Sequence, residues 1–461
     1  MWARRNLPCR PCINSETRTK ALMVRIARRE VLKRLAGGAL AASCAWTHAT
    51  AAAVPDLRYR PESGARLRFM RWKNLAQGDA DQWMANTLKF TQLTGVPVQV
   101  ENITLEETWA KAAVSANVGA GPDIVMGVGG QPQLYAEKCL DLSELAEYLG
   151  SKYGGWYDAV KLLCMTGNRW IAVGSGFLTS CVVYRESLVK AAGFSAIPRD
   201  LSGFLELCRA LKANGTPAGM ALGNASIDAT AWCHWLLWAH GGRLVDENER
   251  VTINSEPTIA ALEYAKALYP TFIANTLSWH DASNNNAFLA GQIGLTYNGI
   301  SIYYVAKTST EPKLKAIAAD IQHAHLPVGA TGRPTELAVF APLWVFNYTR
   351  FPNAAREYLR FMLEREQYET WQRASQGYFS QPLRAYESNA VWTEDPKQTP
   401  FRDGPGITLH TGYAGHPDAA ATACAADFIV VNMIADAATG HLSAREAAAR
   451  AEQRSRRHYR T

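Results

Sequence analysis

The chain has 461 residues, of which 48% are hydrophobic and 19% charged, an ordinary composition for a globular protein but a length too great for one compact core. Residues 1–53 contain ten Lys and Arg against two Glu, a net charge of +8, so residues 54–461 carry −1 of the formal total of +7. Because a neutral body attracts phosphates only weakly, this distribution argues against a nucleic-acid partner.

The basic first segment has the features of an export signal. "ARREVLK" at 27–33 resembles the twin-arginine signature, in which two Arg precede an apolar pair and a Lys. The weakly hydrophobic stretch at 35–45 is too short to cross a bilayer, and small residues at 49–53 offer a cleavage site. We therefore predict a leader at 1–53, with Met23 as a candidate start, and a soluble periplasmic product.

Cys44, at the end of "LAASC", is a poor match to a lipoprotein cysteine because Ala41 stands where Leu is preferred, so we expect no lipid anchor. Six Cys follow the leader, without a C-x-x-C pair. Most of them have apolar neighbours, which favours small buried side chains. A disulfide such as Cys139–Cys164 stays open as an alternative in an oxidising compartment.

Strand-like and helix-like segments alternate from Arg66 onward. "RLRFMRW" predicts a strand at 66–72, and a helix follows from about Gln82 to Leu93. The next segments read as a strand at 96–103, a helix at 105–120 and a strand at 122–128. This alternation is typical of a parallel sheet with crossover helices. We expect an α/β fold with enough strands for two sheets.

Three later segments carry signals for element ends. The stripe of apolar residues within 353–362 predicts a helix capped by Asn353, and Gly440 closes a helix before a capping box of Ser443 and Glu446. "FLAGQIGLTYNG" at 288–299 predicts a helix end, a strand at 293–297 and a turn at its tip. This strand tip is polar but has no titrating group, which suits binding rather than reaction.

Motifs of catalysis are absent from the sequence: there is no P-loop, no G-x-G-x-x-G after a strand, no G-x-S-x-G and no H-E-x-x-H. "GVGG" at 127–130 lacks the Lys of a phosphate loop and predicts a tight loop that faces a ligand. For His323 and His325 a solvated strand edge is commoner than a metal site. Glu106-Glu107 is more often a helix cap than a glycosidase pair. We expect no enzyme, no cofactor and no metal.

Tryptophan is abundant, with 14 in the chain. "WCHWLLW" at 232–238 places Trp232 and Trp235 one helical turn apart, and other Trp lie at the ends of strands or loops. Most Trp pack in cores. Those at the carboxyl ends of strands would point into the cleft of an open α/β sheet, where they could stack on the apolar face of a sugar.

The body contains, in chain order, "AAVSANVGAGPDIVMG" (112–127), "LTSCVVYRESLVKAAGF" (178–194), "HGGRLVDENERVTINSEPTIAALEY" (240–264), "NNNAFLAGQIGLTYNG" (284–299) and "PNAAREYLRFMLEREQYETW" (352–371). From about Arg66 to the end, this ordered set resembles the family 1 extracellular solute-binding proteins of ABC importers, a sugar-binding, maltose-binding-protein-like group. Many members have a Trp just after the Asn-Gly, where this chain has Ile300-Ser301-Ile302.

The resemblance implies a two-lobed periplasmic-binding-protein fold of class II type, whose lobes close over a ligand and deliver it to permease subunits. The N-terminal lobe would comprise 54–174 plus 326–378, and the C-terminal lobe 175–325 plus 379–461. Three hinge crossings would join them near 172–177, 323–327 and 376–382. We expect a monomer.

Ligand contacts are predicted from the strand-end loops of both lobes. The candidate residues are Trp72, Lys73, Asn74, Gln131, Trp232, Asn298, Trp344, Tyr378 and Tyr413. The first prediction of function is capture of a sugar or sugar-like polyol. A polyamine or other small-solute receptor is the alternative within the binding class, although the matched loops offer few carboxylates. A secreted hydrolase is the alternative from another class, and it would need a perturbed acid or nucleophile in the cleft.

Changing Arg28 and Arg29 to Lys tests the export prediction. We expect precursor to accumulate in the cytoplasm, because the paired Arg are the feature that defines this route. Cell fractionation followed by immunoblotting measures the effect, with the same substitution at Arg4 and Arg5 as the control. Normal export of the Arg28/Arg29 variant would contradict twin-arginine routing.

Overall fold

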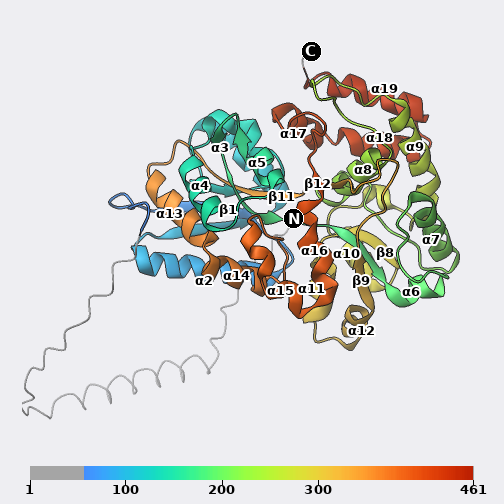
Figure 1. The fold of residues 1–461 in the computed structure, drawn as a ribbon, viewed down its shortest axis with the longest axis horizontal. Helices are drawn as coiled ribbons and strands as arrows, with labels where there is room; N and C mark the ends of the chain where they lie inside the picture. The colour runs from blue at the N-terminus through green and yellow to red at the C-terminus, as the bar shows by residue number, and fades with distance from the viewer. Residues whose placement is uncertain (1–56, 460–461) are drawn as a thin grey trace, which may run out of the picture. The chain divides into compact units, whose positions relative to one another are not determined.

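Two β-sheets organise residues 57–459, the part of the chain that this computed structural model describes (Figure 1). The sheet of the first lobe has the strand order β2 (Val98–Ile103), β1 (Leu67–Trp72), β3 (Ile124–Met126), β11 (Phe340–Val345), β6 (Val173–Phe177). The first three strands are parallel, whereas β11 runs antiparallel to both of its neighbours. The predicted parallel sheet with crossover helices is therefore confirmed.

The second lobe is built on a sheet of three strands, β8 (Leu295–Asn298), β7 (Cys181–Arg185) and β9 (Ile321–Ala324), with β7 antiparallel to both others. Two short pairs complete the strands: β4 (Met165–Thr166) with β5 (Arg169–Trp170), and β10 (Glu336–Leu337) with β12 (Thr408–Leu409). The two lobes confirm the fold class. The predicted leader lies outside the described residues.

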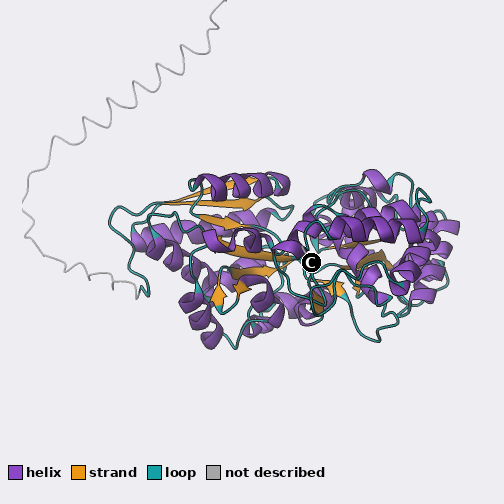
Figure 2. Ribbon diagram, turned by 90° about the horizontal axis from the view of Figure 1, so that it is seen from above, coloured by secondary structure: helices purple, strands orange, loops and turns teal. Residues whose placement is uncertain are grey.

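Helices cover both sheets (Figure 2). Those associated with the first sheet are α2 (Gln77–Thr94), α3 (Leu105–Val118), η1 (Gln131–Lys138), α4 (Ser143–Lys152), α5 (Asp158–Cys164), α13 (Pro352–Leu363), α14 (Arg365–Ala374) and η4 (Arg384–Ser388). The others are α6 (Glu186–Ala191), α7 (Leu201–Ala213), α8 (Asp228–Ala239), α9 (Glu256–Leu268), η2 (Tyr269–Thr271), η3 (Thr276–Ser278), α10 (Ser283–Ala290), α11 (Ser301–Thr308), α12 (Pro312–Asp320), α15 (Val391–Glu394), η5 (Pro396–Gln398), α16 (Thr399–Asp403), η6 (Gly404–Gly406), α17 (Ala419–Ala426), α18 (Ile429–Ala438) and α19 (Ala444–Ser455).

Local signals place several helix ends correctly. Ser443 and Glu446 form the predicted capping box of α19, and Gly291 closes α10 with a φ of 81°. The predicted cap of α13 is wrong, because Asn353 lies inside the helix. Its N–H and that of Ala354 donate instead to the carboxylate of Glu62 (2.8 and 3.1 Å), which is far away in sequence. A carboxylate at this end also complements the helix dipole.

Of two predictions about side-chain exposure, the one for the cysteines is confirmed and the one for His323 is wrong. The six Cys of the body are all buried and unpaired, as small hydrophobic side chains are. His323 is not on a solvated edge, because it packs between Tyr303 and Phe401. Burial lowers the pKa of its imidazole to about 4. Among the described residues, no group of three or more His, Cys, Asp or Glu is arranged to hold a metal ion.

Residues 419–438 are apolar and long enough, by composition, to cross a membrane. The structure divides this stretch at Phe428, whose φ of 52° ends α17 and begins α18. Helix α18 then packs against α8, α9 and α19 in the second lobe. The apolar character of α18 is thus explained by its place in a protein core.

The chain passes between the two sheets at three places. Residues 178–180 join β6 to β7, and residues 325–339, which include β10, join β9 to β11. After α14 the chain bridges to β6 at Ser380, continues through η4 and reaches the second lobe at α15. That these segments act as hinges stays a prediction.

Helix α2 begins at Gln77, earlier than predicted, because its first turn is anchored by a buried ion pair. The carboxylate of Asp79 binds the guanidinium of Arg71 on β1, and both side chains are 1% exposed. Trp371 Nε1 of α14 donates to the same carboxylate (2.6 Å). Asp79 therefore joins a strand and two helices of the first lobe at one point.

Replacing Asp79 by Ala should lower the free energy of unfolding by about 3–5 kcal/mol, because the buried Arg71 guanidinium would lose its counter-charge. Chemical denaturation measures this. The control is Glu366→Ala, which breaks the exposed pair with Lys89 and should cost less than about 1 kcal/mol. Equal effects of the two substitutions would show that the Asp79 pair does not organise the lobe.

Candidate functional site

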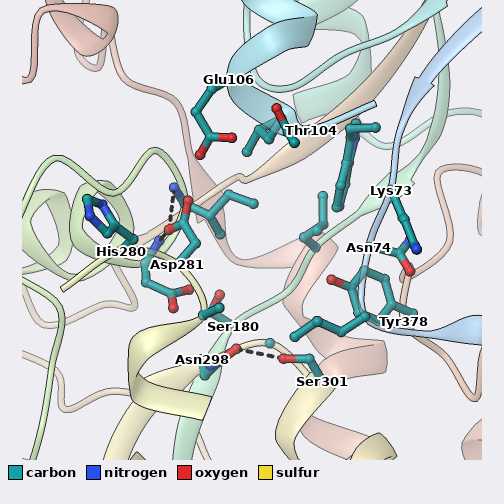
Figure 3. Close-up of a pocket in the computed structure, with 18 of the residues that line it drawn as sticks. Lys73, Asn74, Thr104, Glu106, Ser180, His280, Asp281, Asn298, Ser301 and Tyr378 are labelled. Carbon is teal, nitrogen blue, oxygen red and sulfur yellow. Dashed lines mark hydrogen bonds between the residues drawn. The ribbon is translucent and has the colours of Figure 1, made fainter. Parts of the chain in front are cut away.

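A cavity of about 480 Å³ lies between the two lobes (Figure 3). The first lobe contributes the segment that follows β1 and the end of β2 with the first turn of α3. The second lobe contributes the start of α8, the loop at 280–282 and the end of β8 with the start of α11. Leu178, Ser180 and Tyr378 line the cavity from two of the segments that connect the lobes. The carboxyl ends of β1, β2 and β8 thus meet here, as expected for a binding cleft in α/β sheets.

Aromatic side chains form one wall of the cavity. The rings of Trp72 and Tyr378 lie 6.4 Å apart between centroids, and Phe379 supports Trp72 at 6.0 Å. The indole N–H of Trp72 is buried and has no partner among the described residues. Burial raises the pKa of Tyr378, and the charges of Asp79, Asp228 and Asp281 raise it further. Because both rings line the cavity, this side of it is aromatic.

Asn74 lies beside this wall, but its side-chain amide is hydrogen-bonded to other residues of the protein. Its Nδ2 donates to Asp79 (2.7 Å) and its Oδ1 accepts the N–H of Ala76 (2.9 Å). The neighbouring Lys73 is exposed, and its ammonium forms no ion pair within the described part of the chain. Figure 3 shows Lys73 and Asn74 on the same side of the cavity as Tyr378. Of the pair, Lys73 is the group free to meet a ligand.

The floor of the cavity is a buried network of amides and hydroxyls. Asn298 Nδ2 donates to Asn285 Oδ1 (2.6 Å), and Asn285 Nδ2 donates to Ser301 Oγ (2.8 Å). Ser301 Oγ donates in turn to Asn298 Oδ1 (3.1 Å). Asn284 reaches Asp228 Oδ2 through its Nδ2 (2.8 Å). The polar residues of 284–301 therefore hold the tip of β8 and the start of α11 in position at the floor of the cavity.

Carboxylates gather on the side of the cavity opposite Lys73. Asp228 is the first residue of α8, and burial raises its pKa well above the usual value, with the charge of Asp281 adding to the rise. Asp281 accepts the backbone N–H groups of Ile227 (3.1 Å) and Asp228 (2.9 Å). Burial raises the pKa of Asp281 too, and the charge of Glu106 contributes. Glu106, in the first turn of α3, accepts no hydrogen bond from another described residue.

The structure brings together the predicted residues Trp72, Lys73, Asn74, Asn298 and Tyr378, all of which line the cavity. Trp232 lies elsewhere, in the core of the second lobe. Its Nε1 donates to the carbonyl oxygen of Ala221 (2.6 Å), and its ring packs against Phe272. Because α8 is buried on every side, the repeated Trp of "WCHWLLW" are explained by core packing.

Gln131, Trp344 and Tyr413 also lie outside this cavity. Gln131 and Trp344 are fully buried and pack against Gly127, and Tyr413 packs on Trp238 with the guanidinium of Arg333 over its ring. The "GVGG" loop does not face the cavity either, because Thr422 of α17 covers Gly130 and donates to its carbonyl oxygen (3.3 Å). Ligand contact from these residues stays a prediction that the cavity does not support.

Sequence reasoning missed Asp228, Asp281 and Ser180, and it assigned Glu106 to capping. Glu107 is the residue that caps, since it forms a capping box with Thr104. Asp228 carries one local signal, an acidic residue at the start of an apolar helix, which is also what a helix-stabilising residue looks like. The remaining residues are distant in sequence, and their convergence on one cavity has no local signal.

Residues 87–400 match the model of the bacterial extracellular solute-binding protein family. A probable ABC transporter-binding protein of Deinococcus radiodurans is 22% identical over 292 residues, which cover 61% of this chain and 67% of that protein.

Solved structures of other proteins share the fold. The GacH receptor of Streptomyces glaucescens, determined unliganded and with acarbose and an acarbose homolog, superposes with a TM-score of 0.71 at 19% identity, over 86% of this chain and 99% of that one. A solute-binding protein of Thermotoga lettingae with bound α-D-tagatose has a TM-score of 0.72 at 16% identity, over 86% of this chain and 100% of that one.

Asp228→Asn should raise the melting temperature at pH 7 by a few degrees. The folded-state pKa of Asp228 lies above its unfolded value near 3.8, so ionisation costs stability as pH rises through that window. Asn cannot ionise but still accepts the hydrogen bond of Asn284. Scanning calorimetry between pH 4 and pH 8 measures both the shift and the flatter pH profile.

The control for this measurement is Asp158→Asn, at a carboxylate that is 81% exposed on α5. It should leave the pH profile unchanged. A pH profile of Asp228→Asn that runs parallel to that of the unmodified protein would contradict a buried, costly charge at Asp228.

Proposed function

Because the chain belongs to the bacterial extracellular solute-binding protein family, we propose that it is the periplasmic substrate-binding component of an ABC importer for a sugar or a sugar-like polyol. The observation that carries the proposal is the cavity between the lobes, which combines the aromatic wall of Trp72 and Tyr378 with polar groups from both lobes. The relative from Deinococcus radiodurans, described as a probable ABC transporter-binding protein, supports the transport assignment.

The chemistry of the cavity suits a polyhydroxylated ligand. A sugar or polyol has weakly apolar faces, which stack on aromatic rings, and hydroxyls, which donate to carboxylates and accept from N–H and O–H groups. Glu106, Asp228 and Asp281 supply acceptors, and Lys73 and the unpartnered hydroxyl of Ser180 supply donors. Structural neighbours bind acarbose and α-D-tagatose, which agrees with this class of ligand.

Contacts between the lobes close the site. In this structure Tyr304 of α11 accepts the N–H of Gly78 at the start of α2 (3.0 Å), and Ser380 Oγ donates to Thr179 Oγ1 (2.9 Å). Both contacts join elements of different lobes or of the segments between them. Bending at 178–180, at 325–339 and after α14 would separate the lobes and let the ligand exchange, with the two states differing by a few kcal/mol.

The family is one of extracellular proteins, and we assign this chain to the periplasm, reached by the twin-arginine route predicted for 1–53. Its partners would be the ligand and the inner-membrane permease subunits, with the receptor acting as a monomer. Membership in a family of binding proteins favours a receptor over the secreted hydrolase.

Isothermal titration of the mature protein with a panel of sugars, polyols and polyamines tests the proposal. We expect micromolar or tighter binding of at least one sugar or polyol, and its recovery from the complex chemically unchanged. Trp72→Leu should weaken that binding about tenfold, because it removes the flat ring on which the ligand stacks. Trp156→Leu, a change at a buried Trp outside the cavity, should leave affinity unchanged.

Two results would contradict the proposal. Binding of polyamines alone would assign the protein to another class of ligand. Release of a cleaved product would instead show that the protein is a secreted hydrolase.

A further inference from the structure

The cavity has a charge pattern that a neutral sugar would leave uncompensated. Three of its carboxylates come from three separate elements: Glu106 from α3, Asp228 from α8 and Asp281 from the loop before α10. Among residues 57–459, Lys73 is the single Lys or Arg that lines the cavity. Within the described residues, no Lys or Arg forms an ion pair with any of the three carboxylates.

These carboxylates also retain free acceptor capacity. Asp228 accepts one side-chain hydrogen bond, from Asn284 to Oδ2, and Asp281 accepts two backbone N–H groups through Oδ1. Independently of the acidic groups, the hydroxyl of Ser180 lines the cavity, is 4% exposed as a residue, and has no partner among the described residues. A buried hydroxyl that faces a cavity without a protein partner is available to hydrogen-bond with a ligand.

Asp228 and Asp281 are adjacent, since Asp281 Oδ1 accepts the N–H of Asp228 (2.9 Å), and Glu106 lines the same cavity. Burial raises the pKa of Asp228 and of Asp281, with the charge of Asp281 adding to the first rise and that of Glu106 to the second. Hydroxyl groups can hydrogen-bond to such carboxylates but bring no positive charge, so beside a neutral ligand the repulsion is relieved only by protonation, which the raised pKa of Asp228 and Asp281 favours. A positively charged ligand group would remove this cost.

The opposite side of the cavity limits how much positive charge a ligand can carry. Figure 3 shows Glu106, Asp281 and His280 on one side, and Lys73, Asn74 and Tyr378 on the other. The Lys73 ammonium would repel a second cation at the far end of the ligand, as a linear polyamine would place it. It can instead donate to a hydroxyl that lies over the aromatic wall.

We propose that the ligand is a polyhydroxylated molecule with one protonated amine, an amino sugar or an amino polyol, whose ammonium group is bound by Glu106, Asp228 and Asp281. This inference rests on the proposed function, since it names the subclass of sugar-like ligand that the same cavity selects. The hydroxyl groups of the ligand face Lys73, Ser180 and the ring of Tyr378. The ammonium group distinguishes it from neutral sugars, and its single charge distinguishes it from polyamines.

Matched pairs of compounds test the inference. Isothermal titration of the mature protein would compare glucosamine with glucose and N-acetylglucosamine, galactosamine with galactose, and N-methylglucamine with sorbitol, with spermidine and putrescine as the polyamine arm. We expect at least one amine to bind ten or more times more tightly than its neutral partner. N-acetylation should abolish the advantage, because it removes the charge and keeps the hydroxyls.

Glu106→Gln gives a second measurement on a variant that is expected to fold, because this exposed carboxylate makes no hydrogen bond within the described residues. It should weaken binding of the amine about tenfold and leave the neutral partner unaffected. The matched control is Glu147→Gln on α4, an exposed glutamate remote from the cavity, which should change neither affinity.

The outcomes separate this inference from the function on which it rests. Neutral sugars that bind as tightly as their amines, or an equal effect of Glu106→Gln on both, would overturn the inference and leave the sugar receptor intact. Binding of spermidine without any sugar or polyol, or of no compound in the panel, would overturn the proposed function and the inference together.

Discussion

The buried carboxylate of Asp79 is the constraint on which the first lobe and its side of the cavity depend. A charge that is 1% exposed is tolerated only when it is paired and hydrogen-bonded. The carboxylate of Asp79 accepts hydrogen bonds from Arg71, Asn74 and Trp371. These partners come from β1, from the loop that enters the cavity and from α14. The guanidinium of Arg71 also lies 4.9 Å from the ring centroid of Trp83. One ionic centre therefore fixes the strand end that presents Trp72 and Lys73.

The polar groups at the cavity divide into those that hold the protein together and those that remain free. Asn74, Asn298 and Ser301 line the cavity, but their side chains are bonded to other parts of the chain. Lys73 and Glu106 have no such partners among the described residues. The first set gives the site its shape, and the second set supplies its charge. Residue type alone would have assigned the amides to ligand recognition, whereas the hydrogen bonds assign them mainly to support.

Particular elements show where sequence reasoning succeeded. The parallel strands β1, β2 and β3, the capping box of α19 and the glycine that ends α10 were all predicted, since each depends on residues close together in the chain. The rule that strand ends meet at a cleft found Trp72 and Asn298. Trp344, which the same rule selected, lies near the end of a strand but packs beneath Gly127 and does not line the cavity. The start of α2 and the cap of α13 were misplaced because Arg71 and Glu62 act on them from outside the helices.

The sequence by itself determined the class of fold, the order of its elements and the resemblance to a family of binding proteins. Periodicity, capping and ordered motifs depend on residues that are close together in the chain. Only the tertiary structure decided which polar groups meet. Asp228 and Asp281 are far apart in the chain, yet Asp281 accepts the N–H of Asp228 and both line one cavity. "GVGG" has the composition of a ligand-facing loop, and α17 covers it. Burial and charge at a site are sums over contacts distant in sequence, so they become defined only when the chain has folded.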